Sequence, residues 1–378
     1  MLPENFHIED RTLEPIAQKA LEGERLTFED GVALYGSNDI LTIGYLAHHA
    51  RTRLHGKRTY FNVNRHINPT NVCVASCRLC AFGRKLDAPG AYTMSLEEAF
   101  RTASEGWSEA ITEFHIVGGL HPDLPFEYYV DLIAGLKSRF PSVHLKAFTA
   151  VEIAYYSQRA RLNYRRILET LRGAGLGSIS GGGAEIFAPE TRRKVCDHKI
   201  GAHAWLKVHR TAHELGLHST ATMLYGHVES DEDRVDHLLQ LRGLQDETHG
   251  FMTFIPLKFH PAHTELGKDI DYRDTTGFTD LKAIAVARLL LDNFPHIKAY
   301  WIMLTPRIAQ VALRFGADDI DGTVVEEKIY HDAGATTPQG MTRHELIRLI
   351  HEAGLEPFER DTLYRPVTRT ENAVTVEA

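Results

Sequence analysis

From about residue 60 onward, short runs of β-branched or aromatic residues alternate with longer amphipathic segments. Most successive runs begin roughly 30 to 50 residues apart, a spacing that suits strand–helix units. This alternation predicts an α/β fold, in which six to eight parallel strands form a (β/α) barrel of the TIM type. We expect strands over residues 60–68, 110–117, 144–150, 177–181, 218–225, 250–256, 298–304 and 320–325.

Three segments are expected along the chain. We expect residues 1–55 to form an N-terminal helical extension and residues 56–330 to form the barrel core. Residues 331–378 are expected to form a C-terminal helix and tail that close the barrel. The tail from about Thr368 is polar, and we expect it to be mobile.

Several helix starts are marked by a hydroxyl cap followed by acidic residues in the first turn. Such caps satisfy free backbone amides and complement the positive end of the helix dipole. Gly354 is expected to end the last helix. The expected starts are Thr27 with Asp30, Ser95 with Glu98, Ser230 with Asp233, Thr279 with Asp280, and Thr342 with Glu345.

The composition favours a cytoplasmic protein with a small-molecule substrate. The net charge is −8 and no basic block stands out, so neither a nucleic acid nor an anionic membrane is the expected partner. The N-terminus lacks the apolar segment of a signal peptide, and no run of about 18 apolar residues predicts a membrane span. Four cysteines in 378 residues make no disulfide framework, so we expect reduced thiols that are free to bind metal.

Three of those four cysteines lie in the eight residues CVASCRLC, as Cys73, Cys77 and Cys80. Three thiolates can hold three irons of a cubic [4Fe–4S] cluster and leave the fourth iron open, whereas an electron-transfer cluster normally has a fourth thiolate. A structural zinc site is one alternative, although it needs four ligands and usually uses C-x2-C pairs. Three unrelated buried cysteines are the other. Because the loop follows the first expected strand, it lies where barrel enzymes carry their chemistry.

This cysteine motif resembles that of the radical S-adenosylmethionine superfamily. The resemblance implies that the methionyl amine and carboxylate of S-adenosylmethionine bind the open iron. An electron from the reduced cluster then cleaves the sulfonium to give a 5′-deoxyadenosyl radical. The electron comes from an external donor of the flavodoxin or ferredoxin type.

Two positions depart from the superfamily pattern. Leu79 stands where an aromatic residue is usual, and it can still pack against adenine. The glycine pair Gly118-Gly119 is followed by Leu120 instead of the usual glutamate, which leaves the methionyl amine to backbone carbonyls or to another acid. Phe82 matches a position whose backbone commonly bonds the adenine amino group.

Three further stretches, NRHINPTN from residue 64, SGGGAEIF from residue 180 and FIPLKFHP from residue 254, narrow the resemblance. They are similar to the radical enzymes of the futalosine route to menaquinone, and most of all to the aminofutalosine synthase family, over roughly residues 25–365. For that family the resemblance implies that the adenosyl radical adds to the enolpyruvyl double bond of 3-[(1-carboxyvinyl)oxy]benzoate. The product is 6-amino-6-deoxyfutalosine, with release of methionine and CO2 or bicarbonate.

Two other readings stay open at the level of sequence. The cyclic dehypoxanthinyl futalosine synthases and the deazaflavin F0 synthase subunits share much of the pattern. A zinc-binding barrel protein without redox chemistry is the alternative of a different class.

The substrate implied by the resemblance carries two carboxylates, so its pocket needs cations or backbone donors. We expect five residues at or near strand ends to bind these carboxylates: Arg65, His66, Arg84, Lys258 and His260. Glu185, His121 and His260 are catalytic candidates, and the expected contacts to S-adenosylmethionine are Phe82, Gly118, Gly119 and Glu185.

Two other features have simpler readings. His209 and His213 share a helix face, but no acidic third partner stands at suitable spacing, which disfavours a metal site. Cys196, far from the triplet, is expected to be a structural cysteine.

Overall fold

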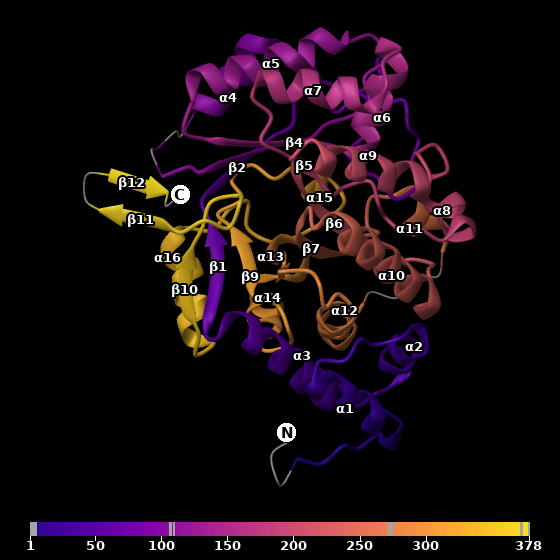
Figure 1. Cartoon of the computed structure of the whole chain (residues 1–378). Helices are drawn as coiled ribbons and strands as arrows, with labels where there is room; N and C mark the ends of the chain where they lie inside the picture. The colour runs from indigo at the N-terminus through magenta and orange to yellow at the C-terminus, as the bar shows by residue number, and fades with distance from the viewer. Residues whose placement is uncertain (1–5, 106–107, 109, 271–274, 371–372, 377–378) are drawn as a thin grey trace.

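The computed structural model describes residues 6–105, 108, 110–270, 275–370 and 373–376. Its main feature is a seven-stranded parallel sheet with the strand order β2-β3-β4-β5-β6-β7-β8. Figure 1 shows this sheet curled at the centre of the molecule, with helices around its outer side. The expected α/β barrel architecture is therefore confirmed, with seven strands in the main sheet.

The strands follow the chain in the expected sequence. Adjacent parallel strands are joined by helical crossovers, because a parallel connection must return along the whole length of the sheet. The strands are β1 Arg58–Asn62, β2 Asn64–Ile67, β3 Glu113–Ile116, β4 His144–Thr149, β5 Ser178–Ser180, β6 His218–Tyr225, β7 Phe251–Lys258, β8 His296–Ile297, β9 Asp319–Gly322, β10 Glu356–Glu359, β11 Val367–Thr370 and β12 Ala373–Val376.

The helices cover the sheet and both ends of the chain. They are η1 Arg11–Leu13, α1 Glu14–Glu22, α2 Phe28–Gly36, α3 Ile40–His55, α4 Leu96–Ser104, α5 Phe126–Arg139, α6 Ala150–Ala160, α7 Tyr164–Ala174, α8 Pro189–Cys196, α9 Ala202–Glu214, α10 Asp231–Thr248, α11 Glu265–Asp269, α12 Gly277–Leu290, α13 Trp301–Leu304, α14 Pro306–Ala312, α15 Ile329–Asp332 and α16 Arg343–Glu352. None of the helices described is long and apolar enough to cross a membrane.

Hydroxyl caps set most of the predicted helix starts. Reciprocal capping boxes are present at Thr27, Ser95, Ser230 and Thr342, and Gly354 follows α16 with a positive φ of 71°. The prediction that Thr279 caps a helix was wrong. Thr276 caps α12, and its hydroxyl accepts the backbone N–H of Thr279 inside the first turn.

Two strand predictions were also wrong. The run 60–68 is divided at Val63, because β1 pairs with β9 and β10 in a separate three-stranded sheet while β2 begins the main sheet. The run 298–304 is not a strand. The sheet pairing stops near Lys298, and Trp301 begins the short helix α13, with its indole N–H donating to the carbonyl of Gly322.

The smaller sheet connects the two edges of the main sheet. A parallel bridge joins Lys298 to Asp319 at the β8 edge, and another joins Arg65 to Val325 at the β2 edge. The barrel is thus completed on one side by irregular pairing around β9, which brings Asp321 beside the interior of the main sheet.

The two ends of the chain take defined positions. The N-terminal helices are confirmed, and α3 packs along α12 while α2 lies against α10 (Figure 1). In the tail, β11 and β12 form an antiparallel hairpin in register from Val367 with Val376, which the sequence did not predict, and the mobility of the tail stays a prediction.

His209 and His213 bond hydroxyl groups of neighbouring elements. Both imidazoles bond the hydroxyl of Ser219, and His213 also bonds Thr248. They fasten α9 to β6.

Candidate active site

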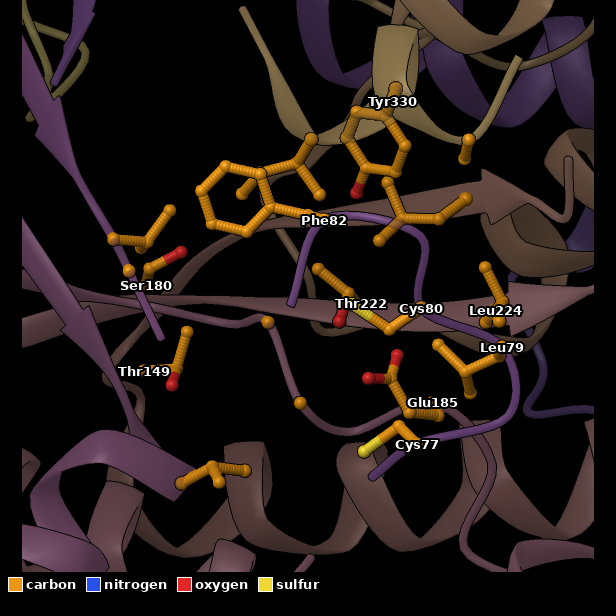
Figure 2. Close-up of a pocket in the computed structure, with 18 of the residues that line it drawn as sticks. Cys77, Leu79, Cys80, Phe82, Thr149, Ser180, Glu185, Thr222, Leu224 and Tyr330 are labelled. Carbon is orange, nitrogen blue, oxygen red and sulfur yellow. The ribbon is translucent and has the colours of Figure 1, made fainter. Parts of the chain in front are cut away.

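Cys73, Cys77 and Cys80 line one cavity at the carboxyl-terminal ends of the main strands. The cavity has a volume of about 260 Å³ and continues into the barrel interior between β2 and β8. Figure 2 shows Cys77 and Cys80 on the side of this cavity where Leu79 and Glu185 also lie. Burial disfavours the thiolate, which raises the pKa of Cys77 to about 12 in the absence of a metal.

The three sulfur atoms are not gathered as closely as the ligand atoms of a single tetrahedral zinc ion. A tetrahedral zinc site holds its sulfur atoms about 3.8 Å apart, given a Zn–S bond of about 2.3 Å. Within the part of the chain that the structure describes, only His55, His296 and Asp318 bring three ligand atoms within 4.8 Å of one another. The three thiols are therefore spread more widely. Asp318 is already paired with Arg288 and bonded by a backbone amide.

Glu185 forms a buried ion pair with Lys199 at the cysteine end of the cavity. Glu185 follows the glycine-rich stretch after β5 and has a positive φ of 47°, which is uncommon for a residue other than glycine. Burial alone would raise the pKa of Glu185, but the Lys199 ammonium more than offsets it and lowers that pKa. Burial opposes the charge of Lys199 as well, yet Glu185 and the nearby thiols hold its pKa well above the ordinary value. Both groups are therefore charged, beside the thiol of Cys77.

The glycine pair after β3 is required by close backbone packing. A Cβ atom at Gly119 would lie 2.2 Å from the carbonyl oxygen of Val72, in the loop that leads to Cys73. The backbone N–H of Gly119 donates to Thr70, and that of Gly118 donates to the Glu152 carboxylate. The pair thus fixes the cysteine loop against the sheet.

Glu152 supplies a carboxylate beside the glycine pair, where the superfamily pattern has one directly after the glycines. Its side chain accepts hydrogen bonds from the backbone and hydroxyl of Thr149 and from Gly118, and it lines the cavity. Burial raises the pKa of Glu152 to about 7.

This raised pKa predicts a pH-dependent stability. The folded protein binds the Glu152 proton more tightly than the unfolded chain, so stability falls as pH rises from the ordinary value of 4.5 to about 7. We expect a relative loss of about 3 kcal/mol that a Glu152→Gln variant does not show. Anaerobic thermal melts of both proteins between pH 5 and 8 measure it. Parallel profiles for the two proteins would contradict the assignment.

The structure brings most of the predicted site residues to the cavity and leaves three outside its lining. Lining it are Phe82, Gly118, Gly119, Glu185, His66, Lys258 and His260. Arg65 points to the opposite face of β2 and pairs with Glu326. Arg84 donates to backbone carbonyls of the cysteine loop, and His121 accepts backbone N–H groups of Asp123 and Leu124.

Several polar residues of the cavity were missed by sequence reasoning. Among those missed are His115, Lys146, Glu152, Lys199, Lys298, Tyr300, Asp321, Glu327 and Tyr330. A signal existed for Lys146, which is a charged residue inside an otherwise apolar run that was predicted as a buried strand. No sequence signal indicated Lys199, because it follows a helix and lies at the cavity only as a result of the tertiary structure.

Family models and curated relatives agree on the family to which this chain belongs. Residues 67–241 match the model described as radical SAM superfamily, and residues 248–373 match the CofH/MqnC C-terminal region. The chain is 51% identical to an aminodeoxyfutalosine synthase of Thermus thermophilus, covering 95% of this chain and 97% of the relative. It is 49% identical to one of Streptomyces coelicolor, with 92% of each chain covered. A cyclic dehypoxanthine futalosine synthase of Halalkalibacterium halodurans is 34% identical, covering 97% of this chain and 98% of the relative.

Solved structures agree on the fold. Methylornithine synthase PylB superposes with a TM-score of 0.70 at 17% identity, covering 90% of this chain and 97% of that chain. The hydrogenase maturase HydG from Carboxydothermus hydrogenoformans superposes with a TM-score of 0.69 at 16% identity, covering 94% and 81%. The chain therefore belongs to the radical SAM superfamily and, within it, to the family that contains the aminodeoxyfutalosine synthases.

Proposed function

We propose that this enzyme joins the adenosyl group of S-adenosylmethionine to 3-[(1-carboxyvinyl)oxy]benzoate. The products are 6-amino-6-deoxyfutalosine, methionine and CO2 or bicarbonate. One observation carries the proposal: three thiols and a set of cationic side chains line the same cavity, in a chain half identical to aminodeoxyfutalosine synthases over nearly its whole length.

Membership of the superfamily implies a [4Fe–4S] cluster and S-adenosylmethionine, and Cys73, Cys77 and Cys80 are the proposed cluster ligands. When bound and reduced, the cluster supplies the electron that cleaves S-adenosylmethionine to the 5′-deoxyadenosyl radical. We propose an external one-electron donor of the flavodoxin or ferredoxin type, because no further cysteine lines the described part of the cavity.

The remaining residues of the cavity would bind and orient the two substrates. Leu79, Phe82 and Tyr330 provide flat or apolar surface near the cysteines, which suits a purine. Among the carboxylates that line the cavity, Glu185 and Glu152 are proposed to hold the methionyl amine and ribose, and Lys199 keeps Glu185 ionised. Apolar side chains lower the local water content, which protects a carbon radical from side reactions.

Product analysis tests this function directly. Cluster-loaded enzyme is incubated anaerobically with reductant, the enolpyruvyl benzoate and S-adenosylmethionine that carries deuterium in the adenosyl group. We expect the label in a single adduct with the mass of 6-amino-6-deoxyfutalosine, together with one methionine per adduct. Free 5′-deoxyadenosine without an adduct would contradict the proposal, and the same assay with dehypoxanthinyl futalosine would then test the sister cyclase activity.

A further inference from the structure

The interior end of the cavity, away from the cysteines, is built from polar side chains. We define the cavity floor as His66, His115, Lys146, Lys298 and Tyr300, all of which line the cavity. His66, His115 and Lys146 are register partners across β2, β3 and β4. The two imidazole rings are stacked with their centroids 4.7 Å apart. Because His66, His115 and Lys146 lie within the strands, the floor is deeper in the barrel than the cysteine loop.

The floor has hydrogen-bond donors that the protein does not use. Lys146 pairs with Glu113 at 2.6 Å and Lys298 with Asp321 at 2.8 Å. An ammonium carries three N–H groups, so each lysine keeps donors to spare beyond its single partner among the described residues. The floor is therefore charge-balanced but rich in free N–H groups.

The uncharged members of the floor make even fewer hydrogen bonds to the protein. Within the described ranges, the imidazoles of His66 and His115 stack on each other but make no side-chain hydrogen bond to the protein. The hydroxyl of Tyr300 has none either, although this residue is only 5% exposed. Burial, and for His115 also Lys146, lowers the pKa of both imidazoles, so each is neutral and offers one N–H. The buried Tyr300 hydroxyl lacks the partner that buried polar groups nearly always have, and the imidazoles line the cavity, so these groups are available to a ligand with acceptor oxygens.

We propose that the cavity floor binds the aromatic carboxylate of the benzoate substrate. The inference rests on the proposed function and deepens it. The alkene that reacts must lie near the cysteine end, and its own carboxylate is attached to it. The second carboxylate stands on the ring, meta to the ether oxygen, so it extends away from the reacting carbons and toward the floor. Val117, Ile255 and Leu257 line the cavity and provide apolar surface for the ring.

A pair of unreactive ligands isolates this contact. The ether 3-(1-carboxyethoxy)benzoate retains both carboxylates but has no alkene, and 2-phenoxypropionate lacks only the aromatic carboxylate. Dissociation constants are measured by anaerobic calorimetry on cluster-loaded enzyme with S-adenosylmethionine and no reductant. We expect wild type to bind the first ligand about a hundredfold more tightly than the second, as several charge-assisted hydrogen bonds imply.

The variants Tyr300→Phe and His115→Gln remove neither ion pair of the floor. Each should reduce the preference for the dicarboxylate about tenfold, while binding of 2-phenoxypropionate stays unchanged. Tyr35→Phe is the matched control, because Tyr35 is also buried with an unpartnered hydroxyl but lies on α2, outside the cavity lining. It should leave the preference unchanged.

Two outcomes would overturn the inference. Equal binding of the two ligands by the wild type excludes a carboxylate subsite at the floor. A preference that survives in both Tyr300→Phe and His115→Gln places the subsite elsewhere. Either result leaves the proposed function standing if the adenosyl adduct still forms, so the two proposals fail separately.

Discussion

Replacing Cys77 with alanine is expected to abolish cluster assembly and all adduct formation. Cys77 is the central thiol of the triplet and is 8% exposed, so no solvent ligand replaces it easily. Two thiolates cannot hold a cubic cluster whose fourth iron must stay open. The anaerobically reconstituted variant should be colourless, without the broad absorption near about 400 nm that iron–thiolate bonding gives. Iron and sulfide analysis provides the same answer independently.

The matched control is Cys196→Ala. Cys196 is also buried, but it ends α8 and does not line the cavity. This variant should retain the brown colour, the iron content and the product. If Cys77→Ala assembles a full cluster, the proposed ligand set is wrong. A colourless wild-type protein that is active with zinc would exclude cluster chemistry altogether.

The second large effect is expected from Gly119→Ala. The added methyl group would lie 2.2 Å from the carbonyl oxygen of Val72, and a backbone atom cannot move aside as a flexible side chain can. The cysteine loop must therefore shift away from β3. We expect a destabilisation of about 3 kcal/mol or more and a severe loss of cluster content. Thermal melting and iron analysis of the anaerobic protein measure the two effects.

Gly173→Ala controls for the loss of a glycine. Gly173 lies inside α7, and a Cβ atom there would meet nothing within 4 Å. Alanine is the better helix former by about 1 kcal/mol, so this variant should be unchanged or slightly more stable, with a full cluster. Equal behaviour of the two variants would show that Gly119 is not a packing requirement.

Much of the fold could be read from local chemistry. Apolar runs and hydroxyl caps act over a few residues, so the parallel strands and the boxes at Ser95, Ser230 and Thr342 were predicted correctly. The errors occurred where distant contacts override local preference. The run 298–304 has strand-like residues, but its sheet neighbours end and Trp301 bonds Gly322 from another element. The hairpin of β11 and β12 depends on strand pairing that no local sequence pattern predicted.

The residues of the site also divide into those that the sequence indicated and those that it did not. Contiguous motifs, such as the cysteine triplet and the glycine pair, were visible because their members are close in sequence. Arg65 and His66 are neighbours on one strand, yet only His66 faces the cavity, because successive side chains point to opposite faces. The sequence alone could not indicate which of the two side chains faces the cavity, because this depends on the register of β2.

The sequence by itself determined the spacing of the three cysteines and the order of strands and helices, because both depend on residue types at short separations. Tertiary structure alone decided which charges share the cavity. It paired Glu185 with Lys199, placed Glu152 beside the glycine pair, and gathered the floor from β2, β3, β4 and the segment after β8. These groups lie far apart in sequence, and they meet because parallel strands in register bring their interior residues to one level of the barrel.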